Sequence, residues 1–528
     1  MKGGDSGPVR GRAMAAMLML ASLPLSAAAG DGFVGRSGDS LTLGGRPFWF
    51  SGTNAYFLME SAARGDTAAV RDVFASARRL EMRVLRTWAF NDSPDSLDAA
   101  VIQYRPGAFN ERALRALDYV VARAREYDLR LVLTLVNSWD DYGGMNQYAR
   151  WRAEHGGTGA AAGTPRYDEE DLRTLVRGGP DRVFRVAVTE TWGHDDFYRD
   201  PVIRSWFRAY VATIAERVNT ITGLVYRDDP VIMAWELANE PRSGDATGET
   251  VAAWAGEMAG HLKSVDPRHL VGTGEEGFDV TPGGYDTGAY GGQTWLFDGS
   301  AGAAFTRNTA LPDVDIASVH LYPEAWGLTA GSGNVWITDH LRIAGNLRKP
   351  LIVGEYGVRT GKESAYRAWL STALYEGAAG AMVWQLLDSN RTDHEGFGIR
   401  CPEDSAVCAV LADAGRGFAA KSAGAPPGPQ AAALRQNYPN PFNGTTTIEY
   451  DLPFDAQVTL ALYEATGRLV VKLVDGPQRA GTRRELLETV SSRLGRVPLA
   501  SGVYFYRIDA RGASGAVHRE TRKLVLIK

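Results

Sequence analysis

Two short apolar segments of the chain each end in a glutamate, and these glutamates are the residues best suited to chemistry. Residues 235–241 carry Asn239 and Glu240, and residues 353–357 carry Glu355. Two buried strands that deliver carboxylates at the same end can form a two-carboxylate site. Such a site can cleave a glycosidic bond, because one carboxyl group protonates the leaving oxygen while the other attacks the sugar carbon or activates water.

Eight apolar, strand-like runs alternate with amphipathic helical stretches between residues 30 and 416. Runs that are almost wholly apolar are typical of strands buried on both faces. The alternation predicts an α/β fold, a (β/α)8 TIM barrel with long loop insertions. The expected strands are residues 48–52, 83–87, 131–136, 231–239, 270–273, 316–320, 351–355 and 381–384, and the expected helices include 67–80, 111–126, 202–220, 250–265 and 363–376.

Two of the connecting loops are long. Residues 140–199 follow the third expected strand, and residues 275–313 follow the fifth. Loops after barrel strands lie on the face that holds the strand C-termini. We expect both loops to shape a cleft there.

The two ends of the chain differ in character from the barrel region. Residues 1–29 combine basic positions, a short apolar stretch and small residues at 27–29, which is typical of an export signal peptide. Residues 417–433, rich in Ala, Gly and Pro, are expected to be a linker. Residues 434–528 contain short alternating runs, which predict a small all-β sandwich.

Composition and cysteine count exclude some classes of function. The net charge of −5 leaves no basic footprint for nucleic acid. Cys401 and Cys408 are the only cysteines; export permits a disulfide between them, reduced thiols are equally compatible, and a four-cysteine zinc site is excluded. We expect no metal, no cofactor and a monomeric protein.

Polar or aromatic side chains follow most of the expected strands at the same end. Burying polar groups there is unfavourable unless they serve one site. The candidates are Arg86 after the second strand, Asn137 and Trp139 after the third, Asn239 and Glu240 after the fourth, His320 and Tyr322 after the sixth, Glu355 after the seventh and Trp384 after the eighth.

These residues, in this order, resemble glycoside hydrolase family 5, and within it the endo-β-1,4-mannanase subfamily. The resemblance spans most of residues 40–400. A lone Asn-Glu-Pro would be weak evidence, but the segments that carry the resemblance occur in order: 85–90, 135–144, 235–242, 274–278 and 320–326. The resemblance implies a retaining hydrolase on a (β/α)8 barrel.

The resemblance also implies roles for single residues. Glu240 matches the general acid/base and Glu355 the nucleophile. Arg86 and Tyr322 match partners of the Glu355 carboxylate, and Asn239 matches the residue that binds the 2-hydroxyl of the sugar. The remaining matches are His320 beside the acid/base, Trp384 as the floor of the subsite that holds the cleaved sugar, and Trp139, Arg242, Glu276 and Trp326 as substrate-binding residues.

Several alternatives stay open at this point. The target could be a β-1,4-glucan, as in cellulases, or the barrel could bind glycans without cleaving them. Residues 152–192 are longer than the subfamily pattern, which would suit an exo-acting β-mannosidase if they close one end of the cleft. Glu236 is expected to form a buried hydrogen-bonded pair, Asp140 and Asp141 to shape a loop, and the 194–196 His-Asp-Asp run to be a solvated loop.

The C-terminal module resembles the sorting domain of the type IX secretion system, which has an immunoglobulin-like fold. The carrying segments are residues 436–443, 446–448, 465–468, 499–505 and 523–528. The resemblance implies that secretion machinery is a partner and that the protein is extracellular or on the cell surface. A carbohydrate-binding sandwich is the competing interpretation, although the module lacks Trp. Taken together, we expect a secreted enzyme that cleaves β-1,4-mannan, galactomannan or glucomannan.

Overall fold

The computed structural model describes Met1 and residues 32–155, 193–281, 283–423, 433–452, 456–478, 481–488, 499–512 and 517–527. Apart from Met1, the expected signal peptide lies outside these ranges, as does most of the 152–192 segment. Among the helices in these ranges, none has the length and apolar character needed to cross a bilayer.

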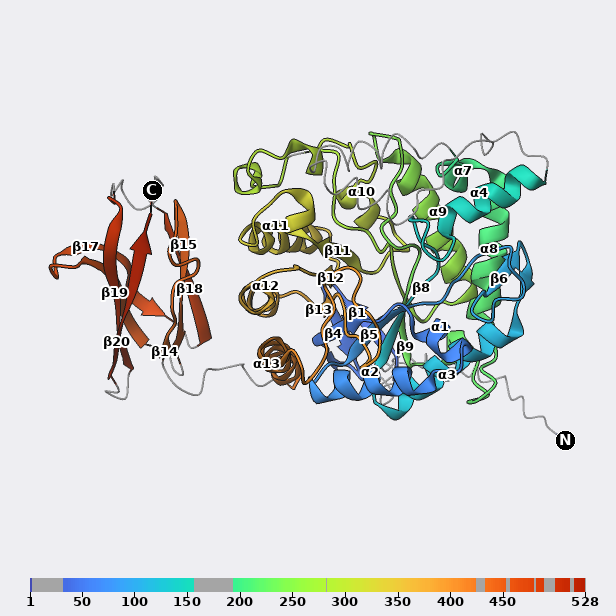
Figure 1. Cartoon of the computed structure of the whole chain (residues 1–528), viewed down its shortest axis with the longest axis horizontal. Coiled ribbons are helices and arrows are strands. Elements are labelled where there is room, and N and C mark those ends of the chain that lie inside the picture. Colours follow the sequence, from blue (N-terminus) through green and yellow to red (C-terminus); the bar gives the residue numbers. More distant parts are fainter. Residues whose placement is uncertain are drawn as a thin grey trace.

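Eight parallel strands form a barrel, which confirms the expected (β/α)8 class (Figure 1). Each expected strand is present within a few residues of its expected bounds. Neighbouring strands pair in the order β10-β9-β8-β5-β4-β13-β12-β11, and a parallel bridge between Gly272 and Ile316 joins the two remaining edges. The strands are β4 (Phe50–Asn54), β5 (Val84–Trp88), β8 (Arg130–Thr134), β9 (Ile232–Glu236), β10 (Leu270–Gly272), β11 (Ala317–Leu321), β12 (Leu351–Tyr356) and β13 (Gly380–Val383).

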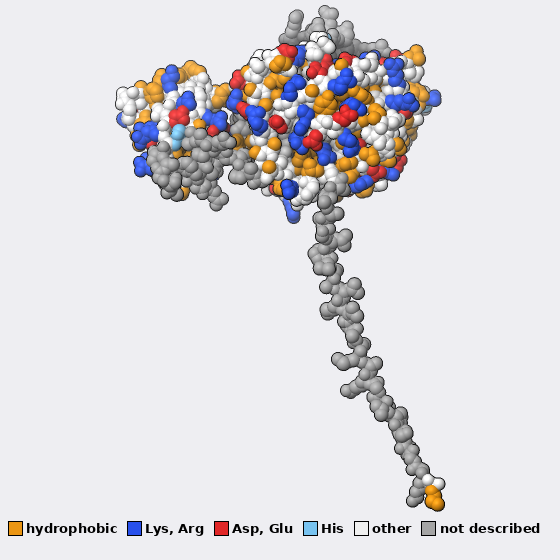
Figure 2. All heavy atoms as spheres, turned by 90° about the horizontal axis from the view of Figure 1, so that it is seen from below, with side chains coloured by type: hydrophobic (Ala, Val, Ile, Leu, Met, Phe, Trp, Pro, Cys, Tyr) orange, Lys and Arg blue, Asp and Glu red, His pale blue; other side chains and the backbone are white. Residues whose placement is uncertain are grey.

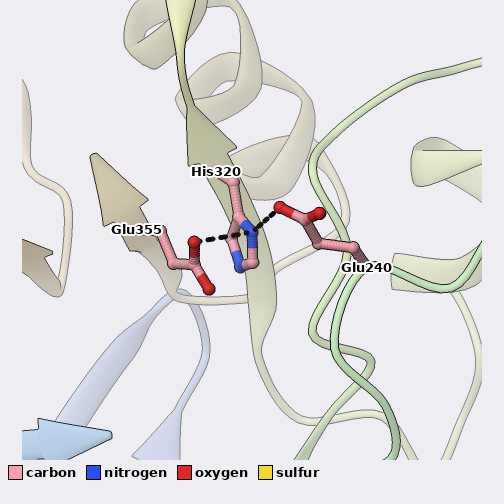
Figure 3. A group of neighbouring side chains, drawn as sticks. All are labelled: Glu240, His320 and Glu355. Carbon is pink, nitrogen blue, oxygen red and sulfur yellow. Dashed lines mark hydrogen bonds and ion pairs between the residues drawn. The ribbon is translucent and has the colours of Figure 1, made fainter. Parts of the chain in front are cut away.

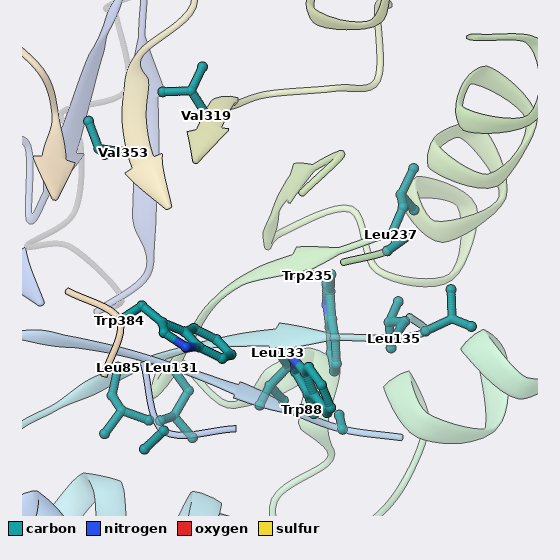
Figure 4. Packing of buried hydrophobic residues seen from close by; sticks show 14 of the residues in the cluster. Leu85, Trp88, Leu131, Leu133, Leu135, Trp235, Leu237, Val319, Val353 and Trp384 are labelled. Atoms are coloured by element: carbon teal, nitrogen blue, oxygen red, sulfur yellow. The ribbon is translucent and has the colours of Figure 1, made fainter. Parts of the chain in front are cut away.

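Side chains along each strand point alternately into the barrel and outward against the surrounding helices. Val84, Val132 and Ile352 belong to one buried cluster inside the barrel. Their neighbours belong to a second cluster that packs against the helices and includes Leu85, Leu131, Leu133, Trp235 and Val353 (Figure 4). Because side chains on one face recur every second residue, the next inward positions are Arg86, Thr134 and Glu236. A polar layer therefore lies directly above the apolar interior.

Helices cover the outside of the barrel, and polar side chains begin several of them. Asp66, Asn110 and Asp200 accept backbone N–H groups at the first turns of α2, α3 and α8. The helices are α1 (Leu58–Ala63), α2 (Thr67–Arg79), α3 (Glu111–Glu126), α4 (Gly144–Glu154), α7 (Asp196–Arg199), α8 (Pro201–Ala215), α9 (Glu249–Val265), α10 (Phe305–Thr309), α11 (Ser332–Asn346), α12 (Lys362–Glu376) and α13 (Ser405–Ser422).

One expected boundary needs correction. The linker was expected from residue 417, but α13 continues to Ser422, where the Ser422 hydroxyl bonds Trp49. The buried Phe418 holds this last part of the helix against the barrel core. The Ala- and Gly-rich composition of the stretch hid this helix, because alanine is also the best helix former.

Small antiparallel elements complete the barrel region. Residues 34–47 form a three-stranded sheet that the sequence did not predict, and a short hairpin precedes α3. The strands are β1 (Val34–Ser37), β2 (Ser40–Leu43), β3 (Arg46–Pro47), β6 (Gln103–Arg105) and β7 (Ala108–Phe109).

The C-terminal module is all β, as expected. Two sheets, ordered β14-β15-β18 and β17-β16-β19-β20, share one buried cluster that is separate from the barrel core. The module lies beside α12, where Ser371 Oγ donates to Glu449 at 3.3 Å and Arg484 donates to Thr372 at 2.5 Å. Its strands are β14 (Ala433–Leu434), β15 (Thr445–Leu452), β16 (Ala456–Glu464), β17 (Leu469–Gln478), β18 (Gly481–Glu488), β19 (Gly502–Gly512) and β20 (Val517–Leu526).

The surface carries charges of both signs. On the face drawn in Figure 2, basic and acidic side chains are interspersed over the barrel and do not form one large patch. This distribution agrees with the small net charge of −5.

Candidate active site

Arg86, at the end of β5, joins the polar layer of the barrel. Its side chain is only 1% exposed. Nε donates to Glu236 at 2.5 Å, Nη1 to Glu355 at 2.6 Å and to Asn54 at 3.2 Å, and Nη2 to Asn239 at 2.8 Å. One guanidinium therefore fixes four side chains from three strand ends, those of β4, β9 and β12.

Glu355 reaches this layer through an irregularity in β12. Val319 pairs with Val353, but the next residue, His320, pairs with Glu355, so Gly354 is an extra residue in β12. Regular alternation would point Glu355 toward the helices, and the bulge turns it into the barrel. A side chain at Gly354 has no space, because its Cβ would lie 2.9 Å from Ser318 Oγ.

The Glu355 carboxylate is held on both oxygens. Arg86 donates to Oε1, and the Tyr322 hydroxyl donates to Oε2 at 2.5 Å. The ring of Phe397 packs edge-on against Tyr322 at 5.3 Å and limits its movement. Such a carboxylate is fixed in orientation and has a cation beside it.

Glu240 lies beyond the end of β9, in a left-handed backbone conformation. Its φ of +49° is uncommon for a residue with a side chain. Its carboxylate is also held on both oxygens, by His320 Nδ1 at 2.7 Å and by the Trp139 indole N–H at 2.7 Å. Unusual backbone geometry of this kind is concentrated at functional sites.

His320 stands between the two glutamates (Figure 3). Its Nδ1 is 2.7 Å from Glu240 and 3.6 Å from Glu355. One carboxylate oxygen of each glutamate and Nδ1 of His320 all lie within 4.8 Å of one another. Among the described residues, these three side chains are the group that is close enough to hold a metal ion. The spacing suits a retaining glycosidase, whose two carboxyl groups are about 5 to 5.5 Å apart.

Burial controls the protonation of this trio. It raises the pKa of Glu240 above its ordinary value, against the opposing effects of Arg242, Trp139 and Arg86. Burial also raises the pKa of Glu355, while His320, Arg86 and Tyr322 oppose it. Because Glu355 alone bonds the guanidinium directly, we expect it to ionise first. The pKa of His320 is lowered, chiefly by burial, so its ring is neutral near pH 7.

A second ion pair borders the acid/base side of the site. Arg242 donates to both oxygens of Glu276, at 2.6 and 2.7 Å. Its guanidinium lies over the rings of Trp139, at 5.2 Å, and Phe278, at 4.9 Å. Burial raises the pKa of Glu276 to about 7 despite this cation. Arg242 thus steadies the indole that bonds Glu240.

Trp384, after β13, forms an aromatic wall on the Glu355 side. Its ring stacks on Tyr56 with centroids 5.5 Å apart, and its indole N–H donates to Glu395 at 2.8 Å. An aromatic plane in this place suits the apolar C–H face of a sugar ring.

Trp326 is the predicted site residue that lies deepest in an aromatic cluster. It is 5% exposed and packs on Trp336 at 4.8 Å and on Phe278 at 5.4 Å. In this position it supports Phe278 and Arg242 from behind. The other predicted residues lie at the mouth of the barrel with Glu240 and Glu355.

Sequence reasoning missed two supporting residues, Asn54 and Glu395. Asn54, after β4, accepts from Arg86 and donates to the Gly354 carbonyl at 2.9 Å, and Glu395 bonds Trp384. Asn137, which the sequence did indicate as a candidate, accepts from Asn239 at 3.1 Å. Asn54 carried a usable signal, since it is a polar residue at the end of an apolar strand like the others.

Charged and polar loop residues outside this site form hydrogen bonds that hold the loops in shape. Asp140 accepts from Asn146 and Arg150, which shapes the loop before α4. The expectation that 194–196 form a solvated loop was wrong for His194, which is buried and bonds Ser138 through Nε2 at 3.1 Å. Asp195 accepts the backbone N–H of Gly244 and so links two loops.

Cys401 and Cys408 form a disulfide in the structure. The bond joins the loop after β13 to the first turn of α13. The same loop supplies Glu395 and Phe397, which contact Trp384 and Tyr322. The disulfide therefore closes the base of a loop that supports the site.

A (β/α)8 barrel with two buried, separately held carboxylates at the C-terminal ends of its strands defines the class of barrel glycoside hydrolases. Residues 31–376 match the family model described as GH family 5 β-mannosidase-like. The chain belongs to this family. Residues 436–525 match the model of a secretion system C-terminal sorting domain.

Curated relatives and solved structures agree with this assignment. Mannan endo-1,4-β-mannosidase 2 of Oryza sativa subsp. japonica is 39% identical, over 72% of this chain and 84% of its own length. The endo-β-1,4-mannanase structure from Thermotoga petrophila superposes with a TM-score of 0.63 at 28% identity, covering 91% of this chain and 98% of that one. An endo-1,4-β-mannanase from Rhizomucor miehei gives 0.60 at 31% identity, covering 73% and 99%.

Proposed function

We propose that the protein is a secreted endo-β-1,4-mannanase that works by double displacement with retention. The observation that carries this proposal is the pair Glu240 and Glu355, each held on both oxygens by different donors, with one oxygen of each within 4.8 Å. Two carboxyl groups with separate environments can take the separate roles of acid and nucleophile.

In the first step, Glu355 attacks the anomeric carbon while Glu240 gives its proton to the leaving glycosidic oxygen. Arg86 and Tyr322 keep Glu355 ionised and aimed. Asn239, fixed by Arg86 and Asn137, supplies its amide to the sugar 2-hydroxyl, a contact that strengthens in the transition state. The products are a glycosyl-enzyme and the released chain end.

In the second step, Glu240 removes a proton from a water molecule, which attacks the anomeric carbon and releases Glu355. The nearby Arg242 and the Trp139 indole N–H favour the ionised form of Glu240 that this step needs. No step calls for a cofactor.

The substrate assignment rests on the relatives and on the mouth of the barrel. The printed names of the relatives are mannan endo-1,4-β-mannosidases, and this chain has aromatic and charged residues near its carboxylates, namely Trp139, Arg242, Glu276 and Trp384. Mannan, galactomannan and glucomannan are the proposed substrates. The 152–192 insertion lies mostly outside the described residues, so the endo mode follows the relatives.

The proposed domain plan follows from the same observations. Residues 1–29 are the signal peptide, the catalytic barrel runs from 30 to the end of α13, and 434–528 form the immunoglobulin-like sorting module. The match of 436–525 supports export through secretion machinery to the outside of the cell or its surface. The catalytic unit is proposed to act as a monomer.

The proposal is tested by the sizes of products from linear β-1,4-mannan, measured beside a β-1,4-glucan. Short manno-oligosaccharides from wild type, with a β-anomer appearing first by NMR, support a retaining endo-mannanase. Glu355→Ala should lose at least a thousandfold in kcat. Glu275→Gln is the matched control, because Glu275 is a buried glutamate that bonds Thr273 and Asn308 away from the carboxylate pair.

Other outcomes separate the rival functions. Mannose as sole product would contradict the endo mode, and cleavage of glucan without mannan would contradict the substrate. Binding of mannan without any cleavage would mean that the barrel is a glycan-binding scaffold.

A further inference from the structure

Glu236, at the end of β9, is a buried carboxylate to which the proposed mechanism gives no role. Its side chain is 6% exposed, and its Oε2 accepts from Arg86 Nε at 2.5 Å and from Thr134 Oγ1 at 3.0 Å. It lies in the inward layer directly above the apolar interior of the barrel. Burying a third carboxylate beside the reacting pair is unfavourable unless its charge is compensated.

The shape of the guanidinium explains what Glu236 can do. The donors of Arg86 point in fixed directions within one plane, so a partner on one edge sets the direction of the others. Glu236 engages Nε, and Thr134 fixes the same carboxylate oxygen. Nη1 is then aimed at Glu355 and Nη2 at Asn239.

The charges at the site give Glu236 a second effect. Arg86 is the cation bonded to both Glu236 and Glu355. Burial works against its charge, but the carboxylates of Glu236 and Glu355 raise its pKa and keep it charged. The other titratable or charged groups that face this cluster come from four strand ends: Glu240 and Arg242 after β9, Glu276 after β10, His320 on β11 with Tyr322 after it, and Glu395 in the loop after β13.

We propose that Glu236 is a positioning residue that orients Arg86 and offsets its charge, and thereby sets the pH range in which Glu355 is ionised while Glu240 is protonated. The inference rests on the proposed retaining mechanism. It assigns the pH range of the enzyme to a carboxylate that does not touch the substrate.

The direction in which the pH profile should shift follows from the charges. A negative group near two carboxyl groups disfavours their ionised forms, so removing it lowers the pKa of both. Activity requires ionised Glu355, which sets the acidic limb of the kcat/KM profile, and protonated Glu240, which sets the alkaline limb. Loss of the Glu236 charge therefore moves both limbs to lower pH, on the order of one pH unit.

The test is the pH profile of kcat/KM for Glu236→Gln in the full chain, on soluble mannan. Gln keeps an acceptor for Arg86 Nε and for the Thr134 hydroxyl, with nearly the same volume. Both limbs displaced to lower pH support the inference. Limbs in the wild-type position, with only kcat or the melting temperature lowered, overturn it and leave Glu236 as a structural group.

A second variant, Glu236→Asp, completes the test. Glu236→Asp keeps the charge but shortens the reach, so we expect a lower kcat with the limbs in place. This variant decides the matter if Glu236→Gln does not fold, and displaced limbs or an unchanged kcat would then contradict the inference. Failure of the proposed function is recognised separately, because wild type would then not cleave mannan or Glu355→Ala would remain active.

Discussion

At the scale of single residues, the site assigns a different set of donors to each of its two glutamates. Glu355 is bonded by a cation and a phenol, whereas Glu240 is bonded by an imidazole and an indole. Neutral donors stabilise an anion less than a guanidinium does. We therefore expect Glu240 to keep its proton to higher pH than Glu355, as its proposed role of acid requires.

Trp139→Phe tests this assignment. The change removes the indole N–H that bonds Glu240 Oε2 and so removes one of the contacts that lower the pKa of Glu240. We expect the alkaline limb of kcat/KM to move to higher pH, by several tenths of a unit or more. kcat should fall about tenfold, because the carboxyl group also loses its orientation. An alkaline limb that stays in place would show that another group is the acid.

Asp92 illustrates a buried carboxyl group whose effect is on stability. Its Oδ1 accepts from Gln103 at 3.1 Å, and burial raises its pKa to about 8, far above the value of 3.8 expected in the unfolded chain. Between these two values the folded state binds more protons, so stability falls as pH rises from about 4 to about 8.

Asp92→Asn should remove this dependence, because the amide is neutral at every pH. We expect the melting temperature of the variant to exceed that of wild type at pH 7.5 and the difference to shrink toward pH 4.5. Thermal unfolding at both values checks this. An equal effect at the two values would mean that Asp92 is ionised in the folded protein.

At the scale of elements, strand order and most helix bounds could be predicted, because apolar runs and 3.6-residue periodicity are local signals. The direction of Glu355 could not. Alternation from Val353 places it on the helix side, and only the pairing of β11 with β12 reveals the extra residue Gly354. The left-handed backbone of Glu240 was equally hidden.

The candidate site was predictable to the extent that each residue stands at the end of a strand. Arg86, His320 and Tyr322 were found in that way. Glu395 was not, because it lies in an irregular loop whose path depends on contacts distant in sequence, such as Arg359 Nε with the Glu395 carbonyl at 2.9 Å.

The loop between β13 and α13 is the element with the clearest stability prediction. Its disulfide closes a short ring, between residues 7 apart in sequence. Cys401→Ser with Cys408→Ser should lower the free energy of unfolding by about 2 kcal/mol. Thermal unfolding with and without a reductant measures this. A matching loss in wild type under reductant is expected, and no change in either would mean that the bond adds nothing.

At the scale of the whole molecule, the chain has two independent cores. The barrel clusters and the cluster of the C-terminal module have no residue in common. In the described part of the chain, hydrogen bonds join Ser371 and Thr372 of α12 to Glu449 and Arg484 of the module. A unit with its own buried core is able to fold alone.

Truncation after Ser422 tests this independence. We expect a folded barrel with kcat/KM on mannan within about twofold of the full chain, since the truncated segment contributes none of the site residues. In the native host, the truncated enzyme should fail to reach the cell exterior. Aggregation of the barrel alone, or unimpaired export, would contradict the two parts of this prediction respectively.

The place where the module meets the barrel has a consequence for how the enzyme would work on solid material. α12 starts near the mouth of the barrel, after β12, and runs back toward the opposite end, so Ser371 and Thr372 lie well down its length. These contacts therefore lie away from the N-terminal end of α12, which adjoins the mouth of the barrel. A surface anchored through the module would thus hold the barrel by its flank and not by the end that carries Glu240 and Glu355.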